Sequence, residues 1–221
     1  IESTGAQIIL NNAYHLMLRP GAERMAHFGG SHRFMRWNKP ILTDSGGFQA
    51  WSMTEGTKLT EEGVEFRSFV DGARIMLSPE RSIAVQNAIG ADIIMAFDDC
   101  PPALRPETPS DDPQLSRKRR SSPGEHRRRL EEAIDRTSRW LARCIGAHAR
   151  KDEQGLFGII QGGTDLELRR RSVEQVCAFD LPGFAIGGVA VGESPEEIHR
   201  TVAEVAPMLP DGKPRYLMGV G

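Results

Sequence analysis

The sequence lacks the features that define membrane proteins, disulfide-bonded proteins and uniformly basic nucleic-acid binders. No run of about 18 apolar residues occurs, so no membrane span is predicted, and the amino-terminal segment is too polar for a signal peptide. There are only three cysteines, widely spaced, which fits neither a disulfide framework nor a zinc pattern and favours the reducing cytoplasm. The net charge is −2, so affinity for nucleic acid must come from local patches.

Chain length and composition predict one soluble globular domain of a larger fold. The chain has 221 residues, of which 39% are hydrophobic and 26% are charged. A complete eight-stranded α/β barrel takes roughly 250 residues. The chain begins at Ile1 without methionine and stops at a predicted strand that enters a glycine turn. We therefore expect a fragment of a single barrel domain, residues 1–221, with material missing at both ends; a small complete α/β domain is the alternative.

Four apolar segments each end at one polar or glycine-flanked group. They are 40–43 before Asp44, 93–97 before Asp98, 156–160 before Gln161, and 184–186 before Gly187 and Gly188. Short apolar runs without alternation are typical of strands buried on both faces, and hence of a parallel sheet. Because functional groups of parallel α/β folds gather at the carboxyl ends of the strands, we expect these groups to belong to one pocket.

Helix signals separate these segments. Ser78 followed by Pro79 predicts a helix start, Gly90 predicts its end, and Ser194 before Pro195 repeats the pattern. Thr164 with Glu167 fits a capping box, and residues 125–148 carry apolar side chains at helical spacing. Strand and helix are therefore expected to alternate from residue 41 to residue 220, which predicts an α/β fold.

One segment, residues 103–124, departs from this pattern. It is rich in Pro, Ser, Asp and Arg and has almost no apolar residues, which predicts a mobile, solvated insertion. Basic residues lie at its end and just beyond it, at 117–120 and 127–129. They indicate either contact with phosphates or a solvated run of charge, and the second interpretation is favoured.

The polar groups at the strand ends have distinct chemistry. Asp44 can act as a general acid or base, and the two glycines after Ser45 let a ligand approach the backbone. For Asp44 the alternative is an aspartate that caps the turn. Asp98 can accept hydrogen bonds from a purine-like N–H and NH₂; the alternatives for Asp98 are an ordinary pair of loop acids and a metal site. Gln161 offers both a donor and an acceptor. The Gly187-Gly188 pair is typical of phosphate-binding turns, although many α/β turns use such pairs.

The chain resembles the tRNA-guanine transglycosylases, the enzymes of queuosine synthesis. The resemblance rests on six ordered motifs and covers nearly the whole chain outside 103–124. They are GAQIILNNAYHL at 5–16, LTDSGGFQ at 42–49, MAFDDC at 95–100, GIIQG at 158–162, GGVAVGE at 187–193 and YLMGVG at 216–221. The resemblance implies the central part of an incomplete (β/α)₈ TIM barrel. It also implies exchange of the wobble guanine of tRNA for a 7-deazaguanine.

The resemblance assigns roles around the exchanged base. Asp44 is the general acid/base, and Asp98 reads the N–H and NH₂ edge of the base. Gln161 and the Gly188 backbone N–H donate to its carbonyl oxygen. The turn residues Ser45, Gly46 and Gly47 also contact the substrate.

Further residues complete this implied site. Phe48 and Met218 stack on the two faces of the base. The Val189 carbonyl, with Glu193 behind it, contacts an aminomethyl group, and the motif at 187–192 is of the bacterial type that uses preQ1. The tail Gly219, Val220 and Gly221 contacts RNA.

Other parts of the family pattern are absent from the chain. The nucleophilic aspartate lies downstream of residue 221, as do the three cysteines and one histidine that hold a zinc ion. We therefore expect no metal ligands here and no exchange activity from the chain alone. The resemblance implies tRNA as partner, a homodimer when intact, and the cytoplasm. The alternatives are a non-catalytic transglycosylase-like subunit, a DNA-directed 7-deazaguanine transglycosylase, and an unrelated barrel enzyme that binds phosphate.

Overall fold

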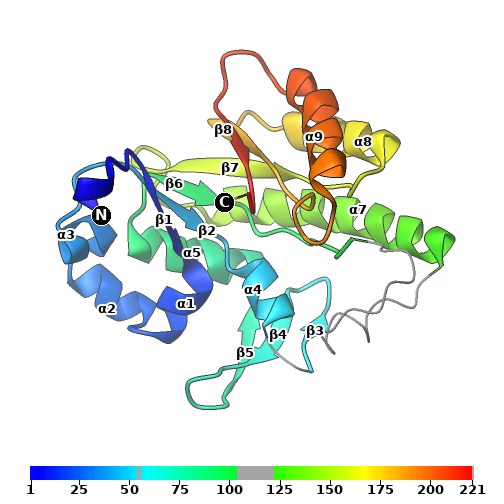
Figure 1. The fold of residues 1–221 in the computed structure, drawn as a ribbon. Coiled ribbons are helices and arrows are strands. Elements are labelled where there is room, and N and C mark those ends of the chain that lie inside the picture. Colours follow the sequence, from blue (N-terminus) through cyan, green and yellow to red (C-terminus); the bar gives the residue numbers. More distant parts are fainter. Residues whose placement is uncertain (54–55, 104–121, 221) are drawn as a thin grey trace. The chain divides into compact units, whose positions relative to one another are not determined.

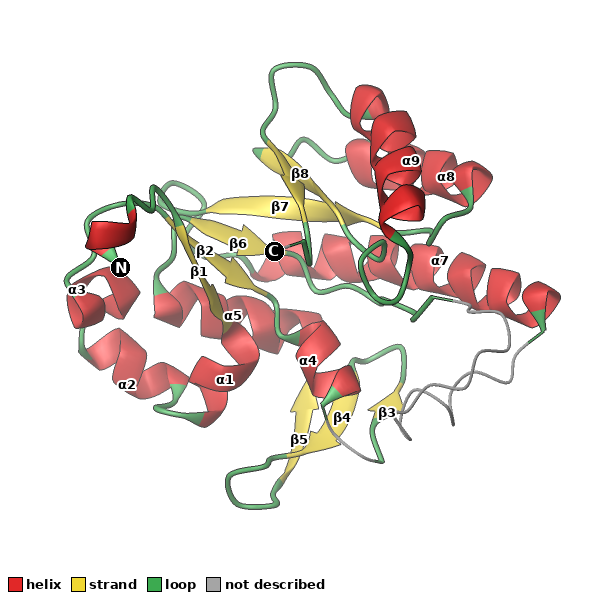
Figure 2. Cartoon of the chain, viewed as in Figure 1, coloured by secondary structure: helices red, strands yellow, loops and turns green. Residues whose placement is uncertain are grey.

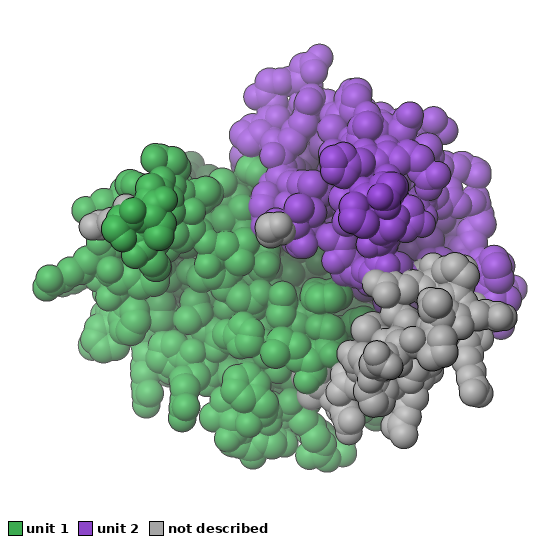
Figure 3. Space-filling view, viewed as in Figure 1, with its two compact units in different colours: residues 1–98, 139–158 green, residues 99–138, 159–221 purple. Residues whose placement is uncertain are grey.

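The computed structural model describes residues 1–53, 56–103 and 122–220, and the chain divides into two compact units (Figure 3). Unit 1 comprises residues 1–98 and 139–158, and unit 2 comprises residues 99–138 and 159–221. Most of the predicted insertion at 103–124 lies outside the described residues, as does Gly221. None of the described helices has both the length and the apolar character that a membrane span requires.

The described strands form two sheets (Figures 1 and 2). The first is parallel in every pair with a described register, and its order is β1-β2-β6-β7-β8-β9. These strands are Ile9–Asn12, Ile41–Asp44, Ile93–Met95, Gly155–Ile160, Gly183–Ile186 and Arg215–Leu217. Strand order that follows chain order, with helices between the strands, is the arrangement of an incomplete (β/α)₈ barrel, which confirms the predicted α/β fold.

The second sheet was not expected. It is antiparallel, with the order β3-β4-β5 at Lys58–Leu59, Val64–Arg67 and Arg74–Leu77. It interrupts the predicted strand–helix alternation between β2 and β6, so that prediction is wrong for this part of the chain. The physical reason is visible in β4, where buried Val64 and Phe66 alternate with Glu65 and Arg67, as in a half-buried antiparallel strand.

The helices of unit 1 begin and end at residues with clear local preferences. They are α1 at Ala13–Leu18, α2 at Ala22–His27, α3 at Gly30–Met35, α4 at Gly47–Ser52 and α5 at Pro79–Ile89, with a 3₁₀ turn at Glu2–Thr4. The predicted start of α5 is confirmed, since the Ser78 hydroxyl accepts from the Arg81 N–H at 3.3 Å. Gly90 ends it in the left-handed conformation, as predicted. In Figure 1, α5 packs among α1, α2 and α3.

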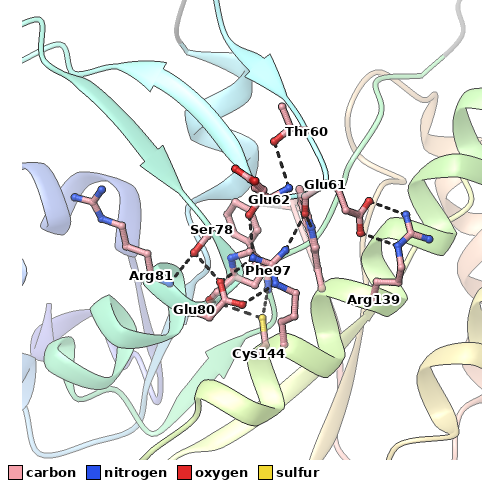
Figure 4. Close-up of polar contacts among 12 residues, drawn as sticks. Thr60, Glu61, Glu62, Ser78, Glu80, Arg81, Phe97, Arg139 and Cys144 are labelled. Carbon is pink, nitrogen blue, oxygen red and sulfur yellow. Dashed lines mark hydrogen bonds and ion pairs between the residues drawn. The ribbon is translucent and has the colours of Figure 1, made fainter.

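The long helix α7, Pro123–Ala147, begins in unit 2 and ends in unit 1, close to the predicted bounds. In unit 1 it joins the antiparallel sheet to the end of β6 (Figure 4). Arg139 donates to both carboxylate oxygens of Glu61, at 2.6 and 2.8 Å. The fully buried Trp140 donates to the Glu61 carbonyl at 2.7 Å, and its ring lies 4.9 Å from the Phe97 ring.

The strands of unit 2 are followed by two helices that contact each other. Its helices are α8 at Leu166–Cys177 and α9 at Pro195–Val205, followed by a 3₁₀ turn at Ala206–Met208. The capping box at Ser194 and Glu197 gives α9 the predicted start. The predicted capping role of Thr164 is wrong, because the Asp165 carboxylate caps α8 and accepts from the Glu167 and Leu168 N–H groups at 3.0 and 3.1 Å.

Candidate active site

Unit 1 places the turn after Asp44 beside the residue that follows β6. Asp44 is the last residue of β2, and Gly47 opens α4. A Cβ atom at Gly47 would lie 2.9 Å from the Phe97 ring and 3.4 Å from the Asp98 carbonyl oxygen. Only glycine permits this approach without a shift of its neighbours. The turn after β2 and the segment after β6 are therefore neighbours within unit 1.

The environment of Asp44 suits a group that exchanges protons near neutral pH. Its Oδ1 atom is buried and has no hydrogen-bond partner among the described residues. Burial disfavours the charged form and raises the pKa of Asp44 from 3.8 to about 6. A carboxyl group with such a pKa can both donate and accept a proton under ordinary conditions.

Asp98 is positioned by the residue before it. The Phe97 N–H donates to the Cys144 sulfur at 3.3 Å, and Asp98 itself is 8% exposed. Burial raises the pKa of Cys144 to about 12, so its sulfur remains a neutral thiol that can accept this hydrogen bond. The end of β6 is thus fixed between α7 and the turn that carries Gly47.

The aromatic side chain predicted to stack on a ligand is accessible. Phe48 lies in the first turn of α4, directly after the glycine turn, and is 36% exposed. Its ring lies 6.5 Å from the ring of Trp51 in the same helix. Ser45 is buried by contrast, and its carbonyl accepts from the Ser82 hydroxyl at 2.7 Å.

Unit 2 brings together three of the predicted residues that lie after β7, β8 and β9. The Gln161 side chain is buried, and its Oε1 atom lies only 2.1 Å from where a Cβ of Gly188 would be. Gly188 has a φ angle of 57°, which glycine adopts readily and other residues rarely. The Met218 sulfur lies 3.4 Å from where a Cβ of Gly187 would be. Gln161, Gly188 and Met218 are therefore neighbours.

The residues after Gly188 lie on a short loop beside a cavity. Val189 is buried, and the Glu193 carboxylate accepts from the Val191 N–H at 2.7 Å. Burial raises the pKa of Glu193 above its ordinary value. Glu193 lines a cavity of about 720 Å³ in unit 2, together with Pro101, Leu130 and other residues. This volume is adequate for a small ligand.

The predicted RNA-contacting tail is described only in part. A Cβ atom at Gly219 would lie 3.2 Å from the Ala190 Cβ, so Gly219 lies against the loop after β8. Val220 is 53% exposed.

The second acid of the Asp98-Asp99 pair is held by arginines of α7. Arg129 donates to the Asp99 carboxylate at 2.5 and 2.8 Å, Arg136 pairs with it as well, and the Asp99 N–H donates to the Thr137 hydroxyl at 3.0 Å. Asp99 is therefore a structural acid of unit 2. Sequence reasoning left this role open, because its arginine partners lie 30 and 37 residues away.

Arg127, in the basic run at 127–129, is also paired with acids. Arg127 forms ion pairs with Glu131 at 3.4 Å and Glu167 at 2.8 Å, and a further one with Asp165. Together with the Arg129–Asp99 pair, these contacts support a structural role for this part of the basic run over contact with phosphates.

No metal site can be assembled from the residues that the structure describes. Within them, no group of three or more His, Cys, Asp or Glu side chains is placed to hold an ion. Cys100, Cys144 and Cys177 are not joined in disulfides, and the raised pKa of Cys144 disfavours the thiolate that a zinc ion needs. The residues present therefore do not fit a zinc ion, and no chemical step is assigned to one.

Sequence reasoning missed one residue that contacts the Gln161 and Gly188 segments. Arg169 of α8 is fully buried and donates to backbone carbonyls of both turns. It is the first of three consecutive arginines, a pattern typical of an exposed face. The only usable signal was its place beside Leu168 and Ser172 on the buried face of the helix.

Comparison with known sequences identifies a family whose members resemble this chain along its whole length. A sequence model of the queuine tRNA-ribosyltransferase family matches residues 1–221. The queuine tRNA-ribosyltransferase of Synechococcus elongatus is 54% identical over 221 residues, which is 100% of this chain and 52% of that protein. The protein of that name from Symbiobacterium thermophilum is 52% identical over 217 residues, or 98% of this chain and 49% of that protein.

A third relative agrees with the first two. The queuine tRNA-ribosyltransferase of Bacillus licheniformis is 48% identical over 221 residues, covering 100% of this chain and 53% of that protein. The chain thus spans about half the length of the curated relatives it matches. Because the family match covers every residue of the chain, the chain belongs to the queuine tRNA-ribosyltransferase family.

Proposed function

We propose that the protein containing this chain is a pentosyltransferase of queuosine biosynthesis that exchanges the wobble guanine of tRNA for the 7-deazaguanine preQ1. Family membership over the whole chain supports this proposal. The observation that carries it is the pair of carboxylates at neighbouring strand ends in unit 1, where Asp44 has a pKa of about 6 and Asp98 is buried.

The proposed reaction uses a nucleophile outside this chain. An aspartate carboxylate attacks C1′ of the ribose, and the C1′–N9 bond breaks with its electron pair on the departing guanine. Asp44 in its protonated form donates a proton to this base, and its carboxylate then takes the N9 proton of the incoming base. The incoming nitrogen attacks C1′ and releases the aspartate, so bonds and protons balance over one exchange.

Recognition of the base is assigned to Asp98, Gln161 and Gly188. The Asp98 carboxylate accepts from the N–H and NH₂ groups, which are donors on guanine and preQ1 alike. The Gln161 amide and the Gly188 N–H donate to the carbonyl oxygen. Mutually matched donors and acceptors discriminate strongly, because a mismatch leaves buried polar groups without partners.

The remaining residues are assigned to stacking and to the substituent of preQ1. Phe48 and Met218 cover the two faces of the ring, and the Val189 carbonyl, with Glu193 behind it, accepts from the aminomethyl ammonium. The hydrogen bond from the Val191 N–H to the Glu193 carboxylate, which holds this acid beside the Val189 loop, supports this last assignment. The tail at 219–221 contacts the tRNA, and the intact protein is a homodimer.

The test is an exchange assay on the full-length protein. Radiolabelled guanine is offered with tRNA that carries guanine at the wobble position, with tRNA that carries adenine there, and with duplex DNA. The proposal expects label only in the first, and unlabelled preQ1 should then release it. Label in DNA would identify the DNA-directed alternative, and label in none would leave the non-catalytic subunit.

A further inference from the structure

Arg169 is a buried cation whose partners are all backbone carbonyls. Its Nε atom donates to the Gly163 carbonyl at 2.7 Å, and one terminal nitrogen donates to the Ile160 and Gly187 carbonyls at 2.8 and 2.7 Å. The other terminal nitrogen donates to the Gly188 carbonyl at 2.8 Å. One guanidinium thus joins the turn after β7 to the turn after β8, within unit 2.

These contacts fix the direction of two backbone donors. In a trans peptide the C=O and N–H groups point in opposite directions, and the peptides of this turn are trans. Because the Gly187 carbonyl points at Arg169, the Gly188 N–H points away from it. The Gly188 carbonyl also points at Arg169, so the Val189 N–H points away from it as well. Arg169 therefore aims two consecutive N–H groups at the side of the turn opposite to itself.

The same contacts fix the Gln161 segment. The Ile160 carbonyl accepts from Arg169 and also from the Gly187 N–H at 3.0 Å. The Gln161 N–H, on the far side of that peptide, donates to the Ser172 hydroxyl at 2.9 Å. Arg169 and Ser172 lie three residues apart on α8 and therefore on one face of the helix. From this face Arg169 binds the carbonyl of the Ile160–Gln161 peptide, and Ser172 binds its N–H.

Burial of the Arg169 charge must be compensated by its surroundings. The four hydrogen bonds to carbonyls supply most of this compensation, and the negative charge of Glu193 also favours the cationic form. Burial lowers the pKa of Arg169 to about 10, which leaves it protonated at neutral pH. Its charge polarises the peptides it contacts and strengthens their N–H groups as donors.

We infer that Arg169 is a positioning residue for base recognition: it presents the polarised Gly188 N–H to the carbonyl oxygen of the base. This inference rests on the proposed function, since it needs a base bound at Gly188. A guanidinium that only stabilised the fold would affect all ligands of the site equally. If Arg169 is a positioning residue, its substitution should weaken the binding only of ligands that have a strong acceptor in the position of that oxygen.

The experiment compares guanine with 6-thioguanine, which keeps the N–H and NH₂ donors but replaces the carbonyl oxygen by a weaker acceptor. Dissociation constants are measured for the full-length protein and for Arg169→Lys. Wild type should prefer guanine, and the variant should reduce this preference by about two- to tenfold, which corresponds to one hydrogen bond. Arg171→Lys is the matched control, because Arg171 lies on the same helix and pairs with Asp135 at 2.6 Å.

Each outcome decides one question. No guanine binding and no exchange by wild type would overturn the proposed function. Guanine binding with an unchanged preference in Arg169→Lys would overturn the positioning role alone. Should this variant not fold, Arg169→Gln replaces it, since the amide is neutral and keeps two donors.

If neither variant folds, a measurement on the wild-type protein tests the inference instead. The Gly188 amide should exchange with solvent in the free protein and become protected when guanine binds. Absence of protection by guanine would show that this N–H does not face the base.

Discussion

Replacing Asp44 by asparagine should remove a pH-dependent destabilisation of the folded protein. The folded carboxyl has a pKa of about 6, whereas its ordinary value is 3.8. Between these values the folded state keeps a proton that the unfolded state has released, so wild-type stability falls as pH rises through this window and the loss is complete above it. At about 1.4 kcal/mol for each pH unit, the full difference corresponds to about 3 kcal/mol.

The assay is urea unfolding of wild type and Asp44→Asn in the full-length protein, from about pH 4 to about pH 8. The asparagine amide does not ionise. The stability of the variant relative to wild type should therefore grow by up to about 3 kcal/mol toward the alkaline end. Asp152→Asn, at an exposed loop position, is the control and should show no such trend. A difference that stays constant with pH would refute the reasoning about the Asp44 environment.

Three further substitutions test other contacts. Gly188→Ala puts a Cβ at 2.1 Å from the Gln161 oxygen, and equilibrium binding should show at least a tenfold (about 1.4 kcal/mol) weaker affinity for guanine; unchanged affinity contradicts the geometry. Asp98→Asn sets a donor against donors, so a folded variant should bind guanine about ten- to a hundredfold more weakly by calorimetry. Arg143→Met removes the hydrogen bond that lowers the pKa of Glu80 from 4.5 to about 2. The Arg143 hydrogen bonds to the Glu61 and Glu62 carbonyls are lost as well, which adds a loss that does not depend on pH. Because the Arg143 and Glu80 side chains are partly exposed, urea unfolding should show a further loss of about 1 kcal/mol above pH 4.5 that vanishes as the pH falls toward 2; a loss of the same size at all pH values contradicts it.

The elements that sequence reasoning found are those that depend on local chemistry. The start of α5 at Ser78 and the capping box of α9 use side chains that contact backbone within three residues, so the pattern and the contact coincide. The strand ends at Asp44 and Gln161 were also found, because a parallel strand buried on both faces must be apolar until it reaches the sheet edge. Local rules thus found these strand ends, whereas the roles of the residues at them follow from the family resemblance.

The features that sequence reasoning missed depend on contacts between residues far apart in the chain, or on two neighbouring residues that could both cap the same helix. Asp165 caps α8 although Thr164 fits the sequence pattern, because the carboxylate reaches two N–H groups at once. The antiparallel sheet leaves a local trace, since Asp71-Gly72 between β4 and β5 is typical of a hairpin turn. Arg169 leaves only its place beside Leu168 and Ser172 on the buried face of α8, because burial of a guanidinium is decided by carbonyls supplied from two separate turns.

The residues proposed to recognise the base are of two kinds. Asp44 and Asp98 supply carboxylates, whereas Gln161 supplies an amide and Gly188 supplies a backbone N–H backed by Arg169. Burial disfavours the charged form of both Asp44 and Arg169, but it brings the pKa of only one of them near neutral pH. It moves the pKa of Asp44 to about 6, within reach of physiological pH, whereas the pKa of Arg169 falls only to about 10. The carboxyl can therefore change its charge during a reaction cycle, and the guanidinium cannot. Substitution of Gln161, Gly188 or Arg169 should accordingly alter which base is preferred, while substitution of Asp44 should alter how exchange depends on pH.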